Sequence, residues 1–307
     1  MPKRLLPPKG SAELADLVSA YRHPDADIRG LADRYGFTNP DALRNAMCRM
    51  GILRSVAYSP KPRYDDAPRL EGDVLGLFDL QFPFHDADFV NRCLDLAHAW
   101  GIRQGILGGD TLNQTAFSWF GHQPQDTWAE EAQTASDALL IMQQAVPGWL
   151  MLKGNHDAHL IKLLGEQIGM GDLLRLLGQP EGYTATDYYY CLANEVWRFS
   201  HPRNISVIHG RVPAFLCDKY EMNIIAGHGH LVGMVPSKSG RWLAIDSGIC
   251  CDPIRLDYNA MRDNTRPVMN QGAVLLRRGH DGCYHPHLVS PLWTDWGAMK
   301  RMYRREV

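Results

Sequence analysis

The segment Gly-Asn-His-Asp at 154–157 combines residue types that can bind a metal ion and move a proton. It follows Trp149–Leu152, an apolar run that we expect to form a buried strand. The glycine lets the backbone turn sharply, because it has no Cβ. Asn155 offers a neutral amide oxygen to a metal ion. His156 can give or take a proton near neutral pH, and Asp157 can orient or charge-balance that imidazole.

Four other short apolar segments end in the same way, at residues that can bind metals. These residues are Asp79 and Gln81 after Gly76–Phe78, Asp110 after Ile106–Gly109, His209 after Val207–Ile208, and His228 and His230 after Ile224–Gly227. In open α/β sheets the carboxyl ends of the strands come together and build the site. We therefore expect the five segment ends to converge on one point.

This set of segments resembles the calcineurin-like, binuclear metallophosphoesterases, whose motifs are D-x-H, G-D, G-N-H-D/E, a lone His and G-H-x-H. The resemblance covers about residues 70–290, and four of the five motifs match. The first motif departs, because Gln81 stands where the family usually has histidine. Asp-x-Gln followed by Pro-Phe-His-Asp at 83–86 is similar to phage-type members of the family.

The resemblance implies two divalent metal ions that share Asp110. The motifs assign Asp79, Asp110 and His230 to the first ion, with Gln81 at the position of the missing histidine. They assign Asp110, Asn155, His209 and His228 to the second ion. His156 would protonate the leaving-group oxygen, with Asp157 tuning its imidazole. This mixed nitrogen and oxygen donor set suits manganese, iron or zinc better than calcium, and manganese is the metal we expect.

Gln81 and His85 are alternative sources of the remaining ligand at the first ion. Gln81 can ligate through its amide oxygen. His85 would instead contact metal or phosphate, or it would simply lie at the entry of a helix. Arg203 and Arg211 lie beside predicted strand ends that carry site residues, where they would hold the substrate phosphate or form surface salt bridges.

Charge is unevenly distributed along the 307 residues of the chain. The formal net charge of −2, with 45% hydrophobic and 21% charged residues, is ordinary for a soluble globular protein. Residues 1–64, however, contain eleven Lys and Arg against six Asp and Glu. A basic front on an acidic body favours contact between the front and a polyanion, the alternative being a solvated basic surface.

Seven cysteines without C-x-x-C spacing, two of them adjacent at 250 and 251, favour reduced thiols and a cytoplasmic location. We expect no signal peptide and no apolar run long enough to span a bilayer, so no membrane partner is predicted. The sequence favours no particular oligomeric state.

Residues 1–56 are predicted to form a small all-α domain that resembles a helix-turn-helix DNA reader. Helices are expected at 11–22, 27–36 and 40–50, the last with Pro40 in its first turn. The third helix would present Arg44, Asn45 and Arg49 to base edges and phosphates. The alternative is a small helical bundle that docks another protein.

Residues 71–307 are predicted to form the metallophosphoesterase domain, after a proline-containing linker over 57–70. Strands and helices alternate in its first half, and strands dominate later. One of the later strands is expected at Ile205–His209. This order predicts an α/β fold with two packed mixed β-sheets flanked by helices.

These observations predict a metal-dependent phosphoesterase that hydrolyses phosphodiesters, in DNA or nucleotides, with a water activated by two metals. The basic front favours DNA as the partner. One alternative is a phosphomonoesterase that acts on phosphoprotein or small metabolites. Another is a DNA-binding adaptor whose metal site has decayed at Gln81.

Overall fold

The computed structural model describes residues 6–23, 26–50, 52, 66–117, 127–256 and 268–303. The chain divides into two compact units, Met1–Asp66 and Ala67–Val307. Most of the linker predicted over 57–70 lies outside the described residues. Its last part differs from the prediction, because Arg69–Leu70 form strand β1 of the second unit.

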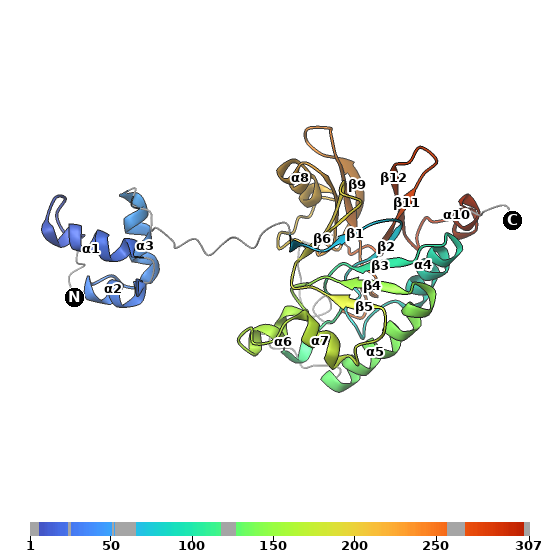
Figure 1. The fold of residues 1–307 in the computed structure, drawn as a ribbon, viewed down its shortest axis with the longest axis horizontal. Helices are drawn as coiled ribbons and strands as arrows, with labels where there is room; N and C mark the ends of the chain where they lie inside the picture. Colours follow the sequence, from blue (N-terminus) through green and yellow to red (C-terminus); the bar gives the residue numbers. More distant parts are fainter. Residues whose placement is uncertain are drawn as a thin grey trace. The chain divides into compact units, whose positions relative to one another are not determined.

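Three helices build the first unit and confirm the helices predicted there (Figure 1). They are α1 (Ala12–Arg22), α2 (Ile28–Arg34) and α3 (Pro40–Arg49). Each begins after a residue whose side chain accepts from backbone N–H groups of the first turn, namely Ser11, Asp27 and Asn39. The buried core of the first unit consists of Leu17, Tyr21, Ile28, Ala32, Leu43 and Met47. The first unit therefore has a hydrophobic core of its own.

Among the described residues, the second unit is built on two six-stranded sheets, as predicted (Figure 1). Sheet A has the order β1-β6-β7-β8-β10-β9, and sheet B has the order β12-β11-β2-β3-β4-β5. The other strands of sheet A are β6 (Tyr190–Ala193), β7 (Trp197–Ser200), β8 (Asn223–Ala226), β9 (Val232–Pro236) and β10 (Leu243–Ser247). The strands of sheet B are β2 (Val74–Leu77), β3 (Gln104–Leu107), β4 (Gly148–Met151), β5 (Tyr183–Ala185), β11 (Ala273–Arg278) and β12 (Tyr284–Val289).

Both sheets are mixed, and each contains a parallel set of strands. In sheet B, β2, β3, β4 and β5 run parallel, so their carboxyl ends lie along one edge. In sheet A, β7, β8 and β10 run parallel in the same way. The remaining pairs include antiparallel ones, such as β11 with β2 and β9 with β10. Each sheet therefore presents a row of strand ends at which a site can be built.

Helices cover the outer faces of the two sheets (Figure 1). The apolar side chains on sheet B pack against α4 (Ala87–Ala99), α5 (Trp128–Ala145), α7 (Met170–Leu176) and α10 (Trp296–Met302). Sheet A packs against α8 (Arg211–Tyr220). Two short helices, α6 (Ala158–Leu163) and η2 (Thr115–Phe117), contact each other. None of the helices within the described ranges is both long and apolar enough to cross a bilayer.

The core between the sheets contains the stacked rings of Phe78 and Phe199, whose centroids lie 6.3 Å apart. Phe78 follows β2 of sheet B, Phe199 belongs to β7 of sheet A, and both are fully buried. The space beside Phe78 exists because glycine lies there. A Cβ at Gly108 would lie 2.0 Å from the ring, and a Cβ at Gly227 would lie 2.5 Å from it. This packing joins the two sheets next to Asp79.

One predicted strand differs from the structure. The predicted strand at Ile205–His209 is wrong, because this segment is irregular and the side chains of Val207 and Ile208 are 55% and 51% exposed. Consecutive apolar residues suggested a buried strand, but here they lie on a surface loop.

Candidate metal centre

Side chains that can bind metals follow the ends of strands in both sheets. Those from sheet B are Asp79 and Gln81 after β2, Asp110 after β3 and Asn155 after β4. Those from sheet A are His201 after β7, with His228 and His230 after β8. Short contacts link these seven residues into two adjacent groups. The sequence predicted six of the seven, and His201 is the exception.

Asp110, His201 and His228 form a group that could hold a metal ion, because their ligand atoms lie within 4.8 Å of one another. His201 Nε2 lies 3.3 Å from Asp110 Oδ2 and 3.1 Å from Asn155 Oδ1. Asp110 and His201 are each only 1% exposed. A carboxylate, an amide oxygen and two imidazoles therefore face the same small volume.

Asp79, Gln81 and His230 form the adjacent group. His230 Nε2 lies 3.2 Å from Asp79 Oδ1 and 3.5 Å from Gln81 Nε2. Asp79 and Gln81 are fully buried. The backbone N–H of His228 donates to Asp79 Oδ2 at 3.0 Å, which links this group to the first one. For Gln81 to ligate a metal beside His230, its amide oxygen must take the place of the amide nitrogen.

Two buried carboxylate oxygens in these groups, Asp79 Oδ1 and Asp110 Oδ2, have no hydrogen-bond donor among the described residues. Each lies near an imidazole nitrogen, of His230 and His201 respectively, but neither contact has hydrogen-bond geometry. Leaving a buried acceptor without a donor costs about 1–3 kcal/mol, and more for a charged group. A divalent cation would satisfy both oxygens, so the donor set fits a metal centre.

The protonation states of the buried residues depend on one another. Burial would raise the pKa of the Asp110 carboxyl, but the imidazoles of His201, His156 and His228 hold it well below its usual range. Burial would lower the pKa of His201, but the Asp110 carboxylate raises it to about 9. His201 is therefore an imidazolium at neutral pH in the metal-free protein. A metal ion bound to its Nε2 would displace that proton.

Five of the seven residues have a left-handed backbone conformation. They are Asp79 (φ 51°), Gln81 (φ 45°), Asp110 (φ 49°), His228 (φ 68°) and His230 (φ 57°). Residues other than glycine seldom adopt this conformation, which costs roughly 1–2 kcal/mol each. Such strain persists where the surrounding structure enforces it, and it concentrates at functional sites. The clustering of strained residues therefore marks this place as functional.

Gly154 is required by the close approach of two loops. Its φ is not left-handed, in contrast to the sharp turn expected from the sequence. A Cβ on Gly154 would lie 2.0 Å from the backbone nitrogen of Asp110 and 2.1 Å from its Oδ1. Without that Cβ the loop after β4 reaches Asp110, and the backbone N–H of His156 donates to Asp110 Oδ1 at 2.8 Å.

The His156 imidazole is oriented by a backbone carbonyl. Its Nδ1 lies 2.9 Å from the carbonyl oxygen of Asn113. A carbonyl only accepts, so Nδ1 carries a hydrogen and Nε2 is the nitrogen that exchanges a proton. The hydrogen bonds described for the Asp157 carboxylate are with backbone groups. Asp157 is fully buried and accepts from the backbone N–H groups of Thr111, Leu112 and Gly154, which ties the loops after β3 and β4 together.

His209 is not brought to the candidate centre, and this corrects its assignment to the second ion. It lies on the exposed loop before α8, where its Nδ1 donates to the carbonyl oxygen of Val232 at 2.6 Å. His201 stands in its place. The sequence contained a signal for His201, because it directly follows Trp197–Ser200, the residues of β7, as the other candidate ligands follow their strands.

His85, Arg203 and Arg211 lie outside the two groups. The ring of His85 packs against Phe82 with centroids 4.6 Å apart, and burial lowers its pKa. The contacts described for His85 do not reach Asp79 or Asp110, and it directly precedes Asp86, the residue that caps α4. Arg203 and Arg211 are exposed over the rings of Tyr189 and Phe215, and neither forms an ion pair within the described part of the chain.

The loop that carries His209 is held by Asp246, whose Oδ2 accepts from the backbone N–H of Gly210 at 2.5 Å. Burial raises the pKa of Asp246 to about 6, above its value in the unfolded chain. The folded state therefore binds this proton more tightly, and its stability falls as pH rises towards and through 6. The free energy of unfolding should lose about 1–2 kcal/mol from this group between about pH 5 and pH 8.

Asp246→Asn removes the charge and keeps an oxygen that can accept from Gly210. We expect this variant to be more stable than the wild type at about pH 8, with a smaller difference at about pH 5. Urea unfolding of both proteins with a chelator present, at the two pH values, measures the effect. A difference that does not grow with pH would show that Asp246 is not protonated more readily in the folded state.

Comparisons with known proteins add little to this geometry. No protein-family model and no curated protein matches the sequence. Similar solved structures include Vps29 from Chaetomium thermophilum, with 11% identity and a TM-score of 0.35, covering 71% of this chain and 94% of that one. A conserved uncharacterized protein and predicted phosphoesterase from Streptococcus pneumoniae has 10% identity and a TM-score of 0.28, covering 71% and 97%.

A third similar structure is wild-type Vps29 complexed with zinc from Entamoeba histolytica. It has 10% identity and a TM-score of 0.34, and the match covers 71% of this chain and 98% of that one. Similarities this weak in both identity and TM-score assign neither a family nor an activity to the chain. The candidate metal centre is therefore the main basis for proposing a function.

Proposed function

We propose that this chain is a metal-dependent phosphoesterase that hydrolyses phosphodiesters, with DNA or nucleotides as the substrate class. The observation that carries the proposal is the convergence, at the strand ends of two sheets, of side chains that can bind metals. They surround two buried carboxylate oxygens that lack hydrogen-bond donors among the residues that the structure describes. The resemblance of the sequence motifs to calcineurin-like metallophosphoesterases supports the same reaction class.

Two divalent cations would fit the two groups of side chains. Asp79, Gln81 and His230 would hold one ion, Asn155, His201 and His228 would hold the other, and Asp110 would bind both. When bound, such ions lower the pKa of a water, orient the ester and neutralise the charge of the transition state. The mixed nitrogen and oxygen donors favour manganese, with iron or zinc as alternatives.

His156 would transfer the proton to the leaving group. The carbonyl oxygen of Asn113 holds its Nδ1 hydrogen, so Nε2 of the imidazolium form is the donor. The hydrogen bond from its backbone N–H to Asp110 keeps this loop against the metal ligands. Asp157 positions the loop through the backbone of Gly154, so it would act on His156 through geometry rather than through charge.

One experiment separates this proposal from the two alternatives. We would assay the full chain with manganese, zinc, iron and magnesium against bis-p-nitrophenyl phosphate, a diester, and p-nitrophenyl phosphate, a monoester. The proposal expects manganese-dependent hydrolysis with the higher kcat/KM on the diester. A preference for the monoester would favour a phosphomonoesterase of phosphoprotein or small metabolites. Absence of hydrolysis with every metal would favour a DNA-binding adaptor with a decayed site.

Gln81→His should strengthen metal binding at the group formed with Asp79 and His230. An imidazole nitrogen binds first-row divalent ions more tightly than a neutral amide oxygen, and it shifts preference towards zinc. The left-handed backbone at position 81 does not oppose the change, because histidine tolerates this conformation comparatively well. We expect the Kd for zinc at one of the two sites to fall by about tenfold or more, as measured by calorimetry. Changes around metal ligands typically alter affinity by about this factor.

His85→Ala is the companion variant for that titration. The ring contact described for His85 is with Phe82 and not with a candidate ligand, so we expect this change to leave both metal affinities unaltered. If Gln81→His binds zinc no more tightly and His85→Ala loses one ion, then His85 is the ligand and Gln81 is not.

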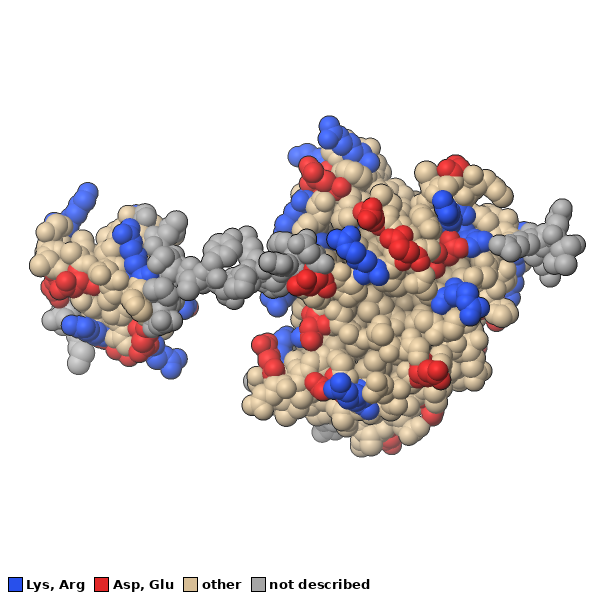
Figure 2. Space-filling view, viewed as in Figure 1, with Lys and Arg blue, Asp and Glu red and all other residues tan. Residues whose placement is uncertain are grey.

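The first unit supports a second proposal, that it binds DNA through α3. Arg44, Asn45 and Arg49 are exposed, whereas Leu43 and Met47 of the same helix are buried in the core of the unit. Arg44 also pairs with Asp41 at 2.7 Å on the exposed surface, which a phosphate could replace. On the face shown in Figure 2, acidic and basic side chains are interspersed, so the proposal depends on α3 and not on a broad basic surface.

Replacing Arg44 and Arg49 together by alanine should weaken DNA binding at every sequence tested. Each arginine that contacts a phosphate contributes about one unit to the slope of log K against log salt. We therefore expect the double variant to lower that slope by up to about two, measured by fluorescence anisotropy at several salt concentrations. Unchanged affinity and slope would reassign the first unit to docking another protein.

A further inference from the structure

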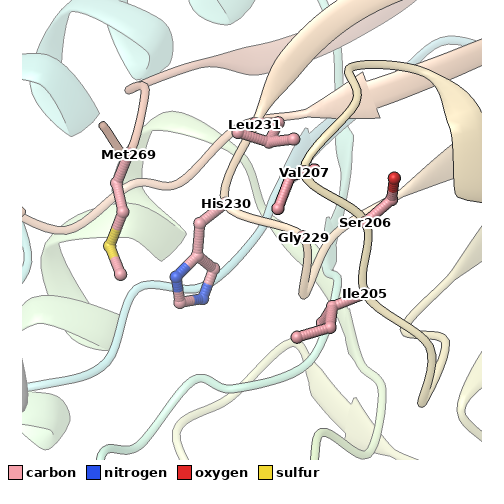
Figure 3. Close-up of a pocket in the computed structure, with 7 residues that line it drawn as sticks. All are labelled: Ile205, Ser206, Val207, Gly229, His230, Leu231 and Met269. Atoms are coloured by element: carbon pink, nitrogen blue, oxygen red, sulfur yellow. The ribbon is translucent and has the colours of Figure 1, made fainter. Parts of the chain in front are cut away.

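A cavity of about 150 Å³ opens beside the candidate metal centre. Its lining, shown in Figure 3, is Ile205, Ser206, Val207, Gly229, His230, Leu231 and Met269. We call it the His230 pocket. The imidazole of His230 lies between the side chains of Met269 and Ile205, so one wall of the pocket is itself a candidate metal ligand (Figure 3).

The His230 pocket is mainly apolar, and its lining divides into a buried part and an exposed part. His230, Leu231 and Met269 are each less than one-tenth exposed. Ile205 and Val207, on the loop after β7, are 47% and 55% exposed. The hydroxyl of Ser206 accepts from the backbone N–H of Ile208 at 3.0 Å, and its own hydrogen can still be donated. The other lining side chains are mostly apolar, so an occupant of the pocket would be held mainly by apolar contact.

The volume of the pocket limits what it can hold. An apolar protein cavity of about 150 Å³ accommodates a benzene-sized molecule. A flat ring also suits the walls, because a thioether sulfur and an imidazole both make favourable contacts with aromatic rings. Two fused rings would fill the pocket and extend out of it towards solvent. The pocket is thus matched to one six-membered aromatic ring.

We propose that the His230 pocket binds a single six-membered aromatic ring carried by the phosphate ester that the metal centre holds. The inference rests on the proposed function, and it narrows the substrate class to esters of a pyrimidine nucleoside or of a simple aryl alcohol. Both share the ring and the phosphate, and they differ in the sugar between them. The pocket adds affinity for the ring, while the metal centre adds affinity for the phosphate.

Binding of matched ligands to the full chain in manganese tests the proposal by calorimetry. Phenyl phosphate is compared with methyl phosphate, and thymidine 5′-monophosphate with ribose 5-phosphate. We expect the ring to tighten binding by at least about tenfold in one pair, a gain typical of filling an apolar pocket. The pair that gains identifies the source of the ring. Equal affinities within both pairs, or absence of binding by all four ligands, would overturn the proposal.

Variants of the exposed loop locate that gain. Ile205→Ala combined with Val207→Ala should remove most of the ring's contribution and leave the Kd of methyl phosphate unchanged. Ile208→Ala is the matched control, because Ile208 is 51% exposed on the same loop and does not line the pocket. A loss of the same size in the control would place the ring elsewhere.

Guanosine 5′-monophosphate tests the limit to a single ring. It should bind no more tightly than ribose 5-phosphate, and an increase in affinity equal to that of thymidine 5′-monophosphate would refute the limit.

These measurements separate the pocket from the reaction. They report binding and not turnover, and hydrolysis of bis-p-nitrophenyl phosphate is measured on the same preparation. Ring-dependent binding without any hydrolysis would count against the proposed function alone. Normal hydrolysis without ring-dependent binding would count against the pocket alone.

Discussion

Replacing His201 by alanine is expected to abolish hydrolysis, whereas replacing His209 by alanine leaves it nearly unchanged. His201 Nε2 lies within 3.3 Å of oxygens of both Asp110 and Asn155, whereas His209 lies on an exposed loop. Loss of a residue that merely orients a metal ligand already costs about 10–100-fold, so loss of a ligand should cost more than about 100-fold. An exposed substitution such as His209→Ala should stay within about twofold.

The readout should include metal content as well as rate. We expect His201→Ala to retain one equivalent of manganese fewer than the wild type, measured by elemental analysis after desalting. His201→Gln is a variant of more similar size, which guards against loss of the fold at this buried position. A folded and active His201→Gln protein, together with an inactive His209→Ala protein, would show that His209 and not His201 is the ligand.

Asp110→Asn should remove both metal ions and lower activity by about 1000-fold or more. The variant keeps an oxygen that can accept from the backbone N–H of His156, so the loop contact survives. It loses the negative charge that both proposed ions share. Bound metal ions supply several kcal/mol of transition-state stabilisation, so their loss should lower the rate strongly. It also removes the carboxylate that holds a proton on His201, so the pKa of that imidazole should fall.

Three measurements on Asp110→Asn test this expectation. Hydrolysis of the diester should vanish, calorimetry should detect neither ion, and the fold should persist by circular dichroism. A well-folded variant with near-wild-type turnover would falsify the binuclear proposal. Retention of one ion would restrict Asp110 to a single metal.

Much of the fold was predictable because it depends on local patterns. Capping residues such as Ser11 and Asn39 mark helix starts, and buried runs such as Val74–Leu77 are apolar at every position. Strand ends also predicted most residues of the candidate metal centre, since parallel strands bring their carboxyl ends together whatever the details of packing. These features follow from residues close in sequence.

The errors arose where distant residues decide the outcome. Val207 and Ile208 look like a strand, but the hydrogen bond from Gly210 to Asp246 in β10 holds their loop at the surface. Nothing near His209 in the sequence reveals that contact. The structural contacts of Asp157 were not predictable for the same reason, because its carboxylate accepts from the backbone N–H groups of Thr111 and Leu112, which belong to another loop.

The left-handed backbone of five candidate ligands has a consequence for how this chain can change over time. Each of these residues strains the backbone, and glycine at any of them would relieve that strain. Function and low backbone strain therefore compete at the same positions. A descendant that lost the reaction would relieve strain by accepting glycine at position 81, 228 or 230, whereas glycine at 79 or 110 would also remove an oxygen that accepts from a backbone N–H, and each such change would move the chain further from regaining a metal centre.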